Sequence, residues 1–152
     1  MNMKTIVRDI RVDTPVERVF DFLLDPNNLP EIWPNIVEVK SVKKSRDNNE
    51  GFSFNWAYKM SGLLFEGKCE TIEHIPYERL VVKSNKGLDS TITWRFQPTG
   101  RETHVTLRFE YQIPASLLKR IKEDIVIQEN EHEVEALLQN LKSRLELQPV
   151  YA

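Results

Sequence analysis

Five polar residues have side chains that could act on a carbonyl compound, and the hydrophobic pattern predicts that they point inward. Tyr58, Ser90 and Tyr111 lie on the apolar sides of predicted strands, and His132 and Gln128 lie on a predicted helix. A phenol or hydroxyl beside an imidazole can polarise a ketone and move a proton, which is general acid–base catalysis. A buried tyrosine or histidine more often makes one structural hydrogen bond. These residues are therefore candidates for ligand contact first and for catalysis second.

A metal site is the next chemistry that the spacing suggests. Glu129 and His132 have the Glu-x-x-His spacing of di-iron bundles, but such sites take two of these motifs and further carboxylates, and the chain has one copy. The segment beginning at His132 also lacks the second histidine of a zinc protease motif, because Ala136 stands there. We therefore interpret this acidic stretch as a solvated helix face and predict no metal site.

Nucleophilic and cofactor chemistry have little support. Cys69 is the one cysteine, so no intrachain disulfide is possible, and it lies on a predicted strand. His74 follows five residues later, where alternation places it on the opposite face unless a bulge intervenes. A free cysteine most often behaves as a small buried hydrophobe. The chain has five glycines and no glycine-rich phosphate loop or nucleophile elbow, so we predict no cofactor.

The segment from Gly51 to Gln112 alternates between apolar and polar residues, which predicts an antiparallel meander with one dry face. The predicted inner face has two interpretations, a solid core or a cavity lined by amphipathic aromatic side chains. It includes Phe54, Trp56, Tyr58, Ser90, Trp94, Phe96, Phe109 and Tyr111.

A short helix is predicted after the first strand. Thr14 is expected to be its N-cap, with Pro15 as the first helical residue and Glu17 three positions after the cap. Apolar residues at 16, 19, 20 and 23 form one stripe, and Asp25-Pro26 ends the helix. Residues 28–34 then predict a second helical turn before a strand that begins near Ile36.

A long helix is predicted from Pro114 to about Leu147, with Pro149 ending it. Its apolar stripe is not straight, because Leu117, Leu118, Ile121 and Ile125 define one face whereas the apolar residues from 127 to 145 define another. The change falls across residues 128–133. Either the helix bends there, or its two halves face different surroundings.

Residues 15–34 read P-V-E-R-V-F-D-F-L-L-D-P-N-N-L-P-E-I-W-P. This run and the order of elements after it resemble the START-like (SRPBCC) superfamily, which includes polyketide cyclases and lipid carriers. The resemblance implies an α+β helix-grip fold: a curved antiparallel sheet of about seven strands, two short helices after the first strand, and a C-terminal helix across the concave face. It also implies a cavity between sheet and helix, with Trp33 near its mouth and Ile121 and Ile125 covering it.

We therefore expect the chain to bind or transport a small hydrophobic ligand, such as a lipid, an isoprenoid quinone or an aromatic polyketide. One alternative is a polyketide cyclase or dehydratase that uses the same cavity, and another is a protein-interaction module. Binding is favoured over catalysis because no inward carboxylate pair is predicted. The expected ligand contacts are Trp33, Phe54, Trp56, Tyr58, Ser90, Trp94, Phe109, Tyr111, Ile121, Ile125 and His132.

Length and charge fit this expectation. A chain of 152 residues predicts one domain spanning residues 1–152, large enough for a sizeable core. The 21 basic and 23 acidic residues are mixed and give a formal charge of −2, so we expect no nucleic-acid partner. The sequence starts without an apolar signal region and has no apolar run of membrane-spanning length. We expect a cytoplasmic protein.

Overall fold

The computed structural model describes residues 3–44 and 51–147. Seven strands form one antiparallel sheet in the order β1-β7-β6-β5-β4-β3-β2, so the first and last strands pair at one side and β2 forms the other edge. The strands are β1 (Met3–Val12), β2 (Ile36–Lys44), β3 (Phe52–Met60), β4 (Leu63–Ile75), β5 (Arg79–Asn85), β6 (Ser90–Thr99) and β7 (Glu102–Gln112). The predicted helix-grip architecture is confirmed.

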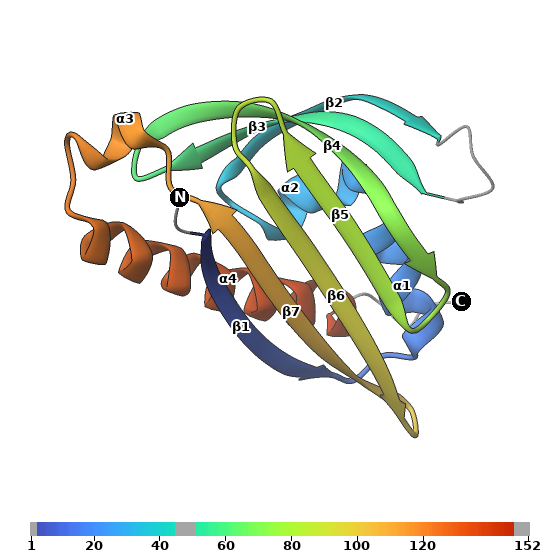
Figure 1. Cartoon of the computed structure of the whole chain (residues 1–152). Coiled ribbons are helices and arrows are strands. Elements are labelled where there is room, and N and C mark those ends of the chain that lie inside the picture. The colour runs from blue at the N-terminus through green and yellow to red at the C-terminus, as the bar shows by residue number, and fades with distance from the viewer. Residues whose placement is uncertain (1–2, 45–50, 148–152) are drawn as a thin grey trace.

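The sheet curves around the helices, which all lie on its concave side (Figure 1). The predicted alternation is confirmed in the central strands, where the even residues are buried from 54 to 60 in β3 and from 90 to 96 in β6, and the odd residues are buried in β7. An antiparallel sheet with one covered face needs this period of two. The concave face therefore brings together large side chains from strands far apart in sequence.

Two short helical segments follow β1, as predicted. Helix α1 (Val16–Leu24) buries the stripe Val16, Val19, Phe20 and Leu23, and η1 (Pro26–Asn28) leads directly into α2 (Leu29–Ile32). The expected Thr14 cap is wrong. Pro15 precedes the helix in extended conformation with no side-chain cap, and the carbonyl of buried Thr14 instead accepts a 2.8 Å hydrogen bond from the Thr103 hydroxyl.

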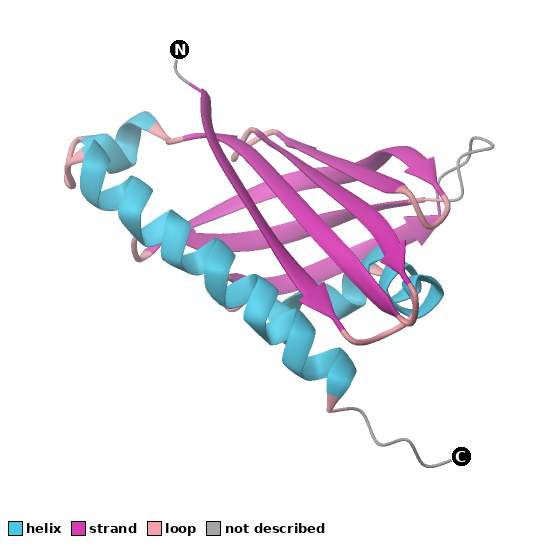
Figure 2. Cartoon of the chain, turned by 90° about the horizontal axis from the view of Figure 1, so that it is seen from below, coloured by secondary structure: helices cyan, strands magenta, loops and turns pink. Residues whose placement is uncertain are grey.

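The C-terminal helix is broken, and the break is not where the sequence pattern changes. Helix α3 (Ala115–Leu118) ends four residues before α4 (Glu123–Glu146) begins, and α4 runs unbroken through residues 128–133 (Figure 2). Pro149, expected to end the helix, lies outside the described residues. Within the described ranges, no helix is both long enough and apolar enough to cross a membrane.

Helix α4 lies along β1 and contacts α2. Its buried residues form one straight stripe with helical spacing. They are Val126, Asn130, Glu133, Val134, Leu137, Leu138, Leu141 and Leu145. Two polar residues therefore point from α4 toward the concave face of the sheet.

Candidate functional site

Five aromatic side chains meet on the concave face opposite α4. Trp56 and Tyr58 come from β3, Phe109 and Tyr111 from β7, and Trp33 directly follows α2. The Trp33 ring lies 5.8 Å from Trp56, 5.9 Å from Tyr58 and 5.5 Å from Phe109, at interplanar angles of 83–90°. These edge-to-face contacts are a favourable arrangement of aromatic rings. We call this group of five residues the aromatic box.

Glu133 points from α4 into the aromatic box. Only 7% of its surface is exposed, and its Oε2 atom accepts hydrogen bonds from the Trp33 indole Nε1 and from the Tyr58 hydroxyl. Its Oε1 atom is buried and has no hydrogen-bond partner in the part of the chain that the structure describes. The described residues therefore bond to the Glu133 carboxyl group through Oε2 only.

Burial changes the acid–base behaviour of this group. Loss of solvent raises the pKa of Glu133 to about 7, although the hydrogen bonds from Tyr58 and Trp33 act in the opposite direction. Burial, together with the nearby Glu133 charge, raises the pKa of Tyr58 well above its ordinary value. The site thus has a carboxyl group that exchanges a proton near neutral pH beside a phenol that stays neutral.

A second polar contact lies beside the box. The Asn130 amide, from α4, donates a 2.9 Å hydrogen bond to the Tyr111 hydroxyl, and the Tyr111 ring stacks on Phe109 at 4.8 Å. Ser90 pairs with Tyr111 across the β6–β7 ladder, and its buried hydroxyl has no partner among the described residues. This side of the concave face therefore contains further polar groups.

Trp56 lies against the backbone of β4. A Cβ atom added at Gly67, the cross-strand partner of Trp56, would come within 2.6 Å of the indole Nε1. A contact this short is not tolerated, so only glycine fits there. The Nε1 donor of Trp56 is buried and unpaired among the described residues. Gly67 thus allows β3 to place a large aromatic side chain flat against the sheet.

Between the sheet and the α1–α2 segment, the structure has only a small void where a ligand-sized cavity was expected. A void of about 10 Å³ lies between the α1–α2 segment and the sheet, and this volume accommodates about one water molecule. Its lining residues include Leu29 and Trp33 on one side and Phe54, Ile92 and Trp94 on the other. A ligand-sized space at this position therefore requires the α1–α2 segment to move away from the sheet.

Several predicted site residues do converge. Trp33, Trp56, Tyr58, Phe109 and Tyr111 form the aromatic box, whereas Phe54 and Trp94 line the void and Ser90 lies next to Tyr111. The position of Trp33 differs from its expectation at a cavity mouth, since its side chain is fully buried and bonded to Glu133.

Ile125 and His132 were predicted on the wrong face of the helix, whereas Ile121 packs against the edge of the core. Ile125 is 44% exposed, His132 is exposed, and Ile121 is partly buried in the break between α3 and α4. The buried stripe of α4 passes through 126, 130 and 133, which turns residues 125 and 132 toward solvent. Gln128, the other helix candidate, is exposed for the same reason. The interpretation of the acidic stretch 129–136 as a solvated face is wrong for Asn130 and Glu133. The spacing from Val126 to Leu137 was the signal that could have found them.

Cys69 and His74 contact different neighbours. Burial raises the pKa of the Cys69 thiol to about 12. A register shift in β4 between Thr71 and Glu73 turns the chain, and the His74 ring packs 5.2 Å from Phe20 in an edge contact. Within the described ranges, no cluster of three His, Cys, Asp or Glu residues could hold a metal ion.

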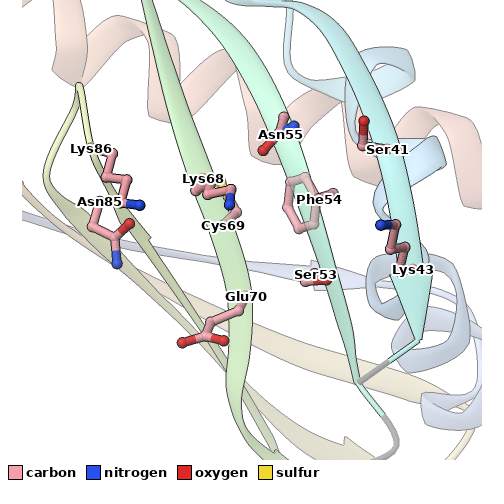
Figure 3. A pocket seen from close by; sticks show the side chains of 10 residues that line it. All are labelled: Ser41, Lys43, Ser53, Phe54, Asn55, Lys68, Cys69, Glu70, Asn85 and Lys86. Carbon is pink, nitrogen blue, oxygen red and sulfur yellow. The ribbon is translucent and has the colours of Figure 1, made fainter. Parts of the chain in front are cut away.

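The outer side of the sheet has a larger but polar hollow. An open groove of about 460 Å³ crosses β2 to β5 (Figure 3). Lysine, serine and asparagine side chains dominate its lining, with Lys43, Lys68 and Lys86 among them. An apolar molecule gains little by entering such a groove. The apolar concave face is therefore the better candidate for a ligand site.

Comparisons with known proteins agree with this geometry. The sequence model of the family described as "Polyketide cyclase / dehydrase and lipid transport" matches residues 3–146. No curated protein sequence matches the chain. Many solved structures share its fold. TTHA0849 from Thermus thermophilus is 22% identical with a TM-score of 0.75, and the match covers 95% of this chain and 98% of that one. A START superfamily protein from Mycobacterium smegmatis is 12% identical with a TM-score of 0.78, and the match covers 94% and 97% of the two chains. The Zhui aromatase/cyclase from Streptomyces is 13% identical with a TM-score of 0.75, and the match covers 95% and 94%.

The match of the family model covers most of the chain, and the sheet order and the long α4 are those expected of a START-like helix-grip protein. The chain therefore belongs to the polyketide cyclase/dehydrase and lipid transport family.

Proposed function

We propose that this protein binds a small, largely apolar ligand between the concave face of its sheet and helices α1, α2 and α4. The observation that supports the proposal most directly is the aromatic box with the half-paired Glu133 at its centre. Ligand sites are typically apolar and aromatic with a few convergent polar groups. A region that served only as core would have little use for a buried carboxyl group, which is costly to bury.

The ligand has to open the closed interior. Drug-sized ligands occupy pockets of roughly 300–1,000 Å³, whereas the void beside Trp33 measures about 10 Å³. The α1–α2 segment forms one wall of this void, so its outward movement would enlarge the space without breaking the sheet ladder. We expect binding to select a more open conformation.

The test combines native mass spectrometry of protein purified from its host with a matched pair of variants. Ile92→Phe adds bulk in the void, and Ile72→Phe makes the same change at an exposed position of β4. We expect a co-purified apolar molecule in the wild type and in Ile72→Phe, and its loss in Ile92→Phe. Retention of the molecule in folded Ile92→Phe would place its site elsewhere and contradict the proposal.

A second candidate function is acid–base catalysis, and the specific observation that favours it is the proton exchange of Glu133 near neutral pH. In dehydration of a β-hydroxyketone, Glu133 would remove the proton from the carbon next to the carbonyl. The carbon–carbon double bond then forms as the carbon–oxygen bond breaks, and the same proton leaves with the hydroxide as water.

This reaction can be followed with 4-hydroxy-4-phenylbutan-2-one, because the enone product absorbs in the near ultraviolet. Turnover by the wild type that falls by about a hundredfold or more in Glu133→Gln would match loss of a general acid or base. No turnover, in a protein that binds the compound, would restrict the function to binding.

A further inference from the structure

Glu133 has an unmet need for one hydrogen-bond donor. Both donors that reach it, from Trp33 and Tyr58, go to Oε2, and the buried Oε1 atom has none among the described residues. Among the residues that the structure describes, no cation offsets the charge at this site. Arg8 is the basic side chain that approaches this part of α4, and it pairs with Glu131 and Glu135 on the exposed side instead.

Either protonation state leaves the same atom unsatisfied. An ionised Glu133 needs a donor at Oε1, and a protonated Glu133 with its proton on Oε1 needs an acceptor there. An unpaired polar group in an apolar interior costs free energy comparable to a lost hydrogen bond, and more when it is charged. A hydroxyl group can meet both needs, because it donates and accepts.

Trp33 shows what kind of group fits this environment. Its flat ring makes edge-to-face contacts with Trp56, Tyr58 and Phe109, and its ring N–H donates to the carboxyl group. The same indole borders the void. A planar ring with its own donor, placed beside Trp33, would make ring contacts of the same type. Its donor would bond to Oε1, the oxygen that Trp33 leaves free.

We propose that the ligand carries a hydroxyl group on an aromatic ring, and that this hydroxyl donates a hydrogen bond to Oε1 of Glu133. The inference rests on the proposed binding function and narrows its ligand class. A phenolic molecule fits. A quinone or an ether offers no donor and so can satisfy only a protonated Glu133, and the carboxylate of a fatty acid would face an ionised Glu133 with a charge of the same sign.

The test uses two probes of nearly equal shape, 2-naphthol and 2-methoxynaphthalene, which differ in whether the oxygen carries a proton. Affinities are measured by calorimetry for the wild type, Glu133→Gln and Glu135→Gln. Glu135 lies on the exposed side of the same helix and serves as the matched control. At pH 8.5, where Glu133 is ionised, a hydrogen bond to a charged group predicts that the wild type prefers 2-naphthol over 2-methoxynaphthalene by about tenfold or more.

In Glu133→Gln the amide oxygen can still accept from Trp33 and Tyr58, which leaves an N–H group at the free position. We expect the preference for naphthol to vanish or reverse in this variant and to persist in Glu135→Gln. A second variant, Tyr58→Phe, removes one donor from Glu133 and should keep or increase the preference. A preference that survives in folded Glu133→Gln would overturn the inference.

Failure of the inference and failure of the proposed function give different results. Equal binding of both probes to the wild type, lost in Ile92→Phe, would overturn the hydroxyl inference and leave interior binding in place. Binding of neither probe, with no molecule co-purified from the host, would overturn both.

Discussion

Glu133 links the stability of the protein to pH. Its pKa is raised from 4.5 to about 7 in the folded state. At pH values between these two, the folded protein therefore keeps a proton on Glu133 that the unfolded chain has released. The stabilisation from the protonated form is complete below about pH 4.5 and is lost as the pH rises through about 7. A shift of this size corresponds to a free energy on the order of 3 kcal/mol.

The matching prediction compares the wild type with Glu133→Gln, which stays neutral at every pH. We expect the unfolding free energy of the variant to exceed that of the wild type by a margin that grows from pH 5 to pH 8.5. Burial keeps the neighbouring Tyr58 and Tyr111 neutral in this range. Urea unfolding at a series of pH values measures the difference, with Glu135→Gln as control. A pH-independent difference would show that Glu133 does not titrate as described.

Cys69 gives a second prediction at the residue scale. With the thiol pKa raised to about 12 by burial, roughly one molecule in ten thousand carries the reactive thiolate at pH 8. We expect labelling by a disulfide reagent such as DTNB to be slower by at least a hundredfold in the native protein than in urea. Rapid labelling of the native protein would mean that β4 exposes this thiol through local opening.

The inward or outward position of a side chain was predictable where apolar residues recur at a regular spacing. The inward positions of Trp56, Tyr58 and Tyr111 follow from alternation along β3 and β7. Glu133 was missed because carboxylates are almost never fully buried without a partner, so the acidic stretch suggested a solvent-facing surface. Trp33 and Tyr58, which supply its partners, lie 100 and 75 residues away in sequence.

At the scale of elements, α4 has one buried stripe rather than two. The change of face inferred from the apolar residues disappears once Asn130 and Glu133 are counted as buried. Ile125 then belongs to the solvent side, and Leu138 to the core.

This arrangement predicts unequal costs for two truncations on the same helix. Leu138→Ala should lower the unfolding free energy by about 2–5 kcal/mol, because it leaves a cavity in the core. Ile125→Ala should change it by less than about 0.5 kcal/mol, as expected of an exposed position. Equilibrium urea unfolding of both variants provides the comparison. Similar large losses for both would show that the N-terminal part of α4 is buried.

Two element boundaries lay beyond local sequence signals. The break between α3 and α4 falls at Lys119-Arg120-Ile121-Lys122, which contains neither proline nor glycine. The start of α1 is set by a contact from β7, since the Thr103 hydroxyl bonds to the carbonyl of Thr14. Tertiary contacts decide such boundaries. The capping pattern around Thr14 describes only the helix start that the local sequence favours.

On the scale of the whole molecule, the family fold was predictable but its closed interior was not. Alternation and helix order specify which faces meet, whereas the width of the space between them depends on how closely the side chains of α1, α2 and the sheet interlock. Among the described residues, three polar contacts join α2 and its C-cap to α4. They are Trp33 to Glu133, the Asn140 amide to the Ile32 carbonyl at 2.9 Å, and the exposed pair of Arg144 with Glu31.

These contacts predict how fast a ligand enters. If opening requires α2 to leave α4, only the small fraction of molecules that are open can bind the ligand. Loss of one contact between α2 and α4 raises that fraction. Asn140→Ala removes a partly buried hydrogen bond of about 1 kcal/mol, so the association rate of 2-naphthol should rise roughly fivefold. Glu31→Gln weakens the long, exposed pair with Arg144 but keeps the contact of Arg144 with the Phe22 ring, so it should leave the rate nearly unchanged. Stopped-flow measurement of the naphthol fluorescence gives both rates. Equal rates in wild type and Asn140→Ala would mean that the ligand enters by another route, and that α2 stays on α4 during binding.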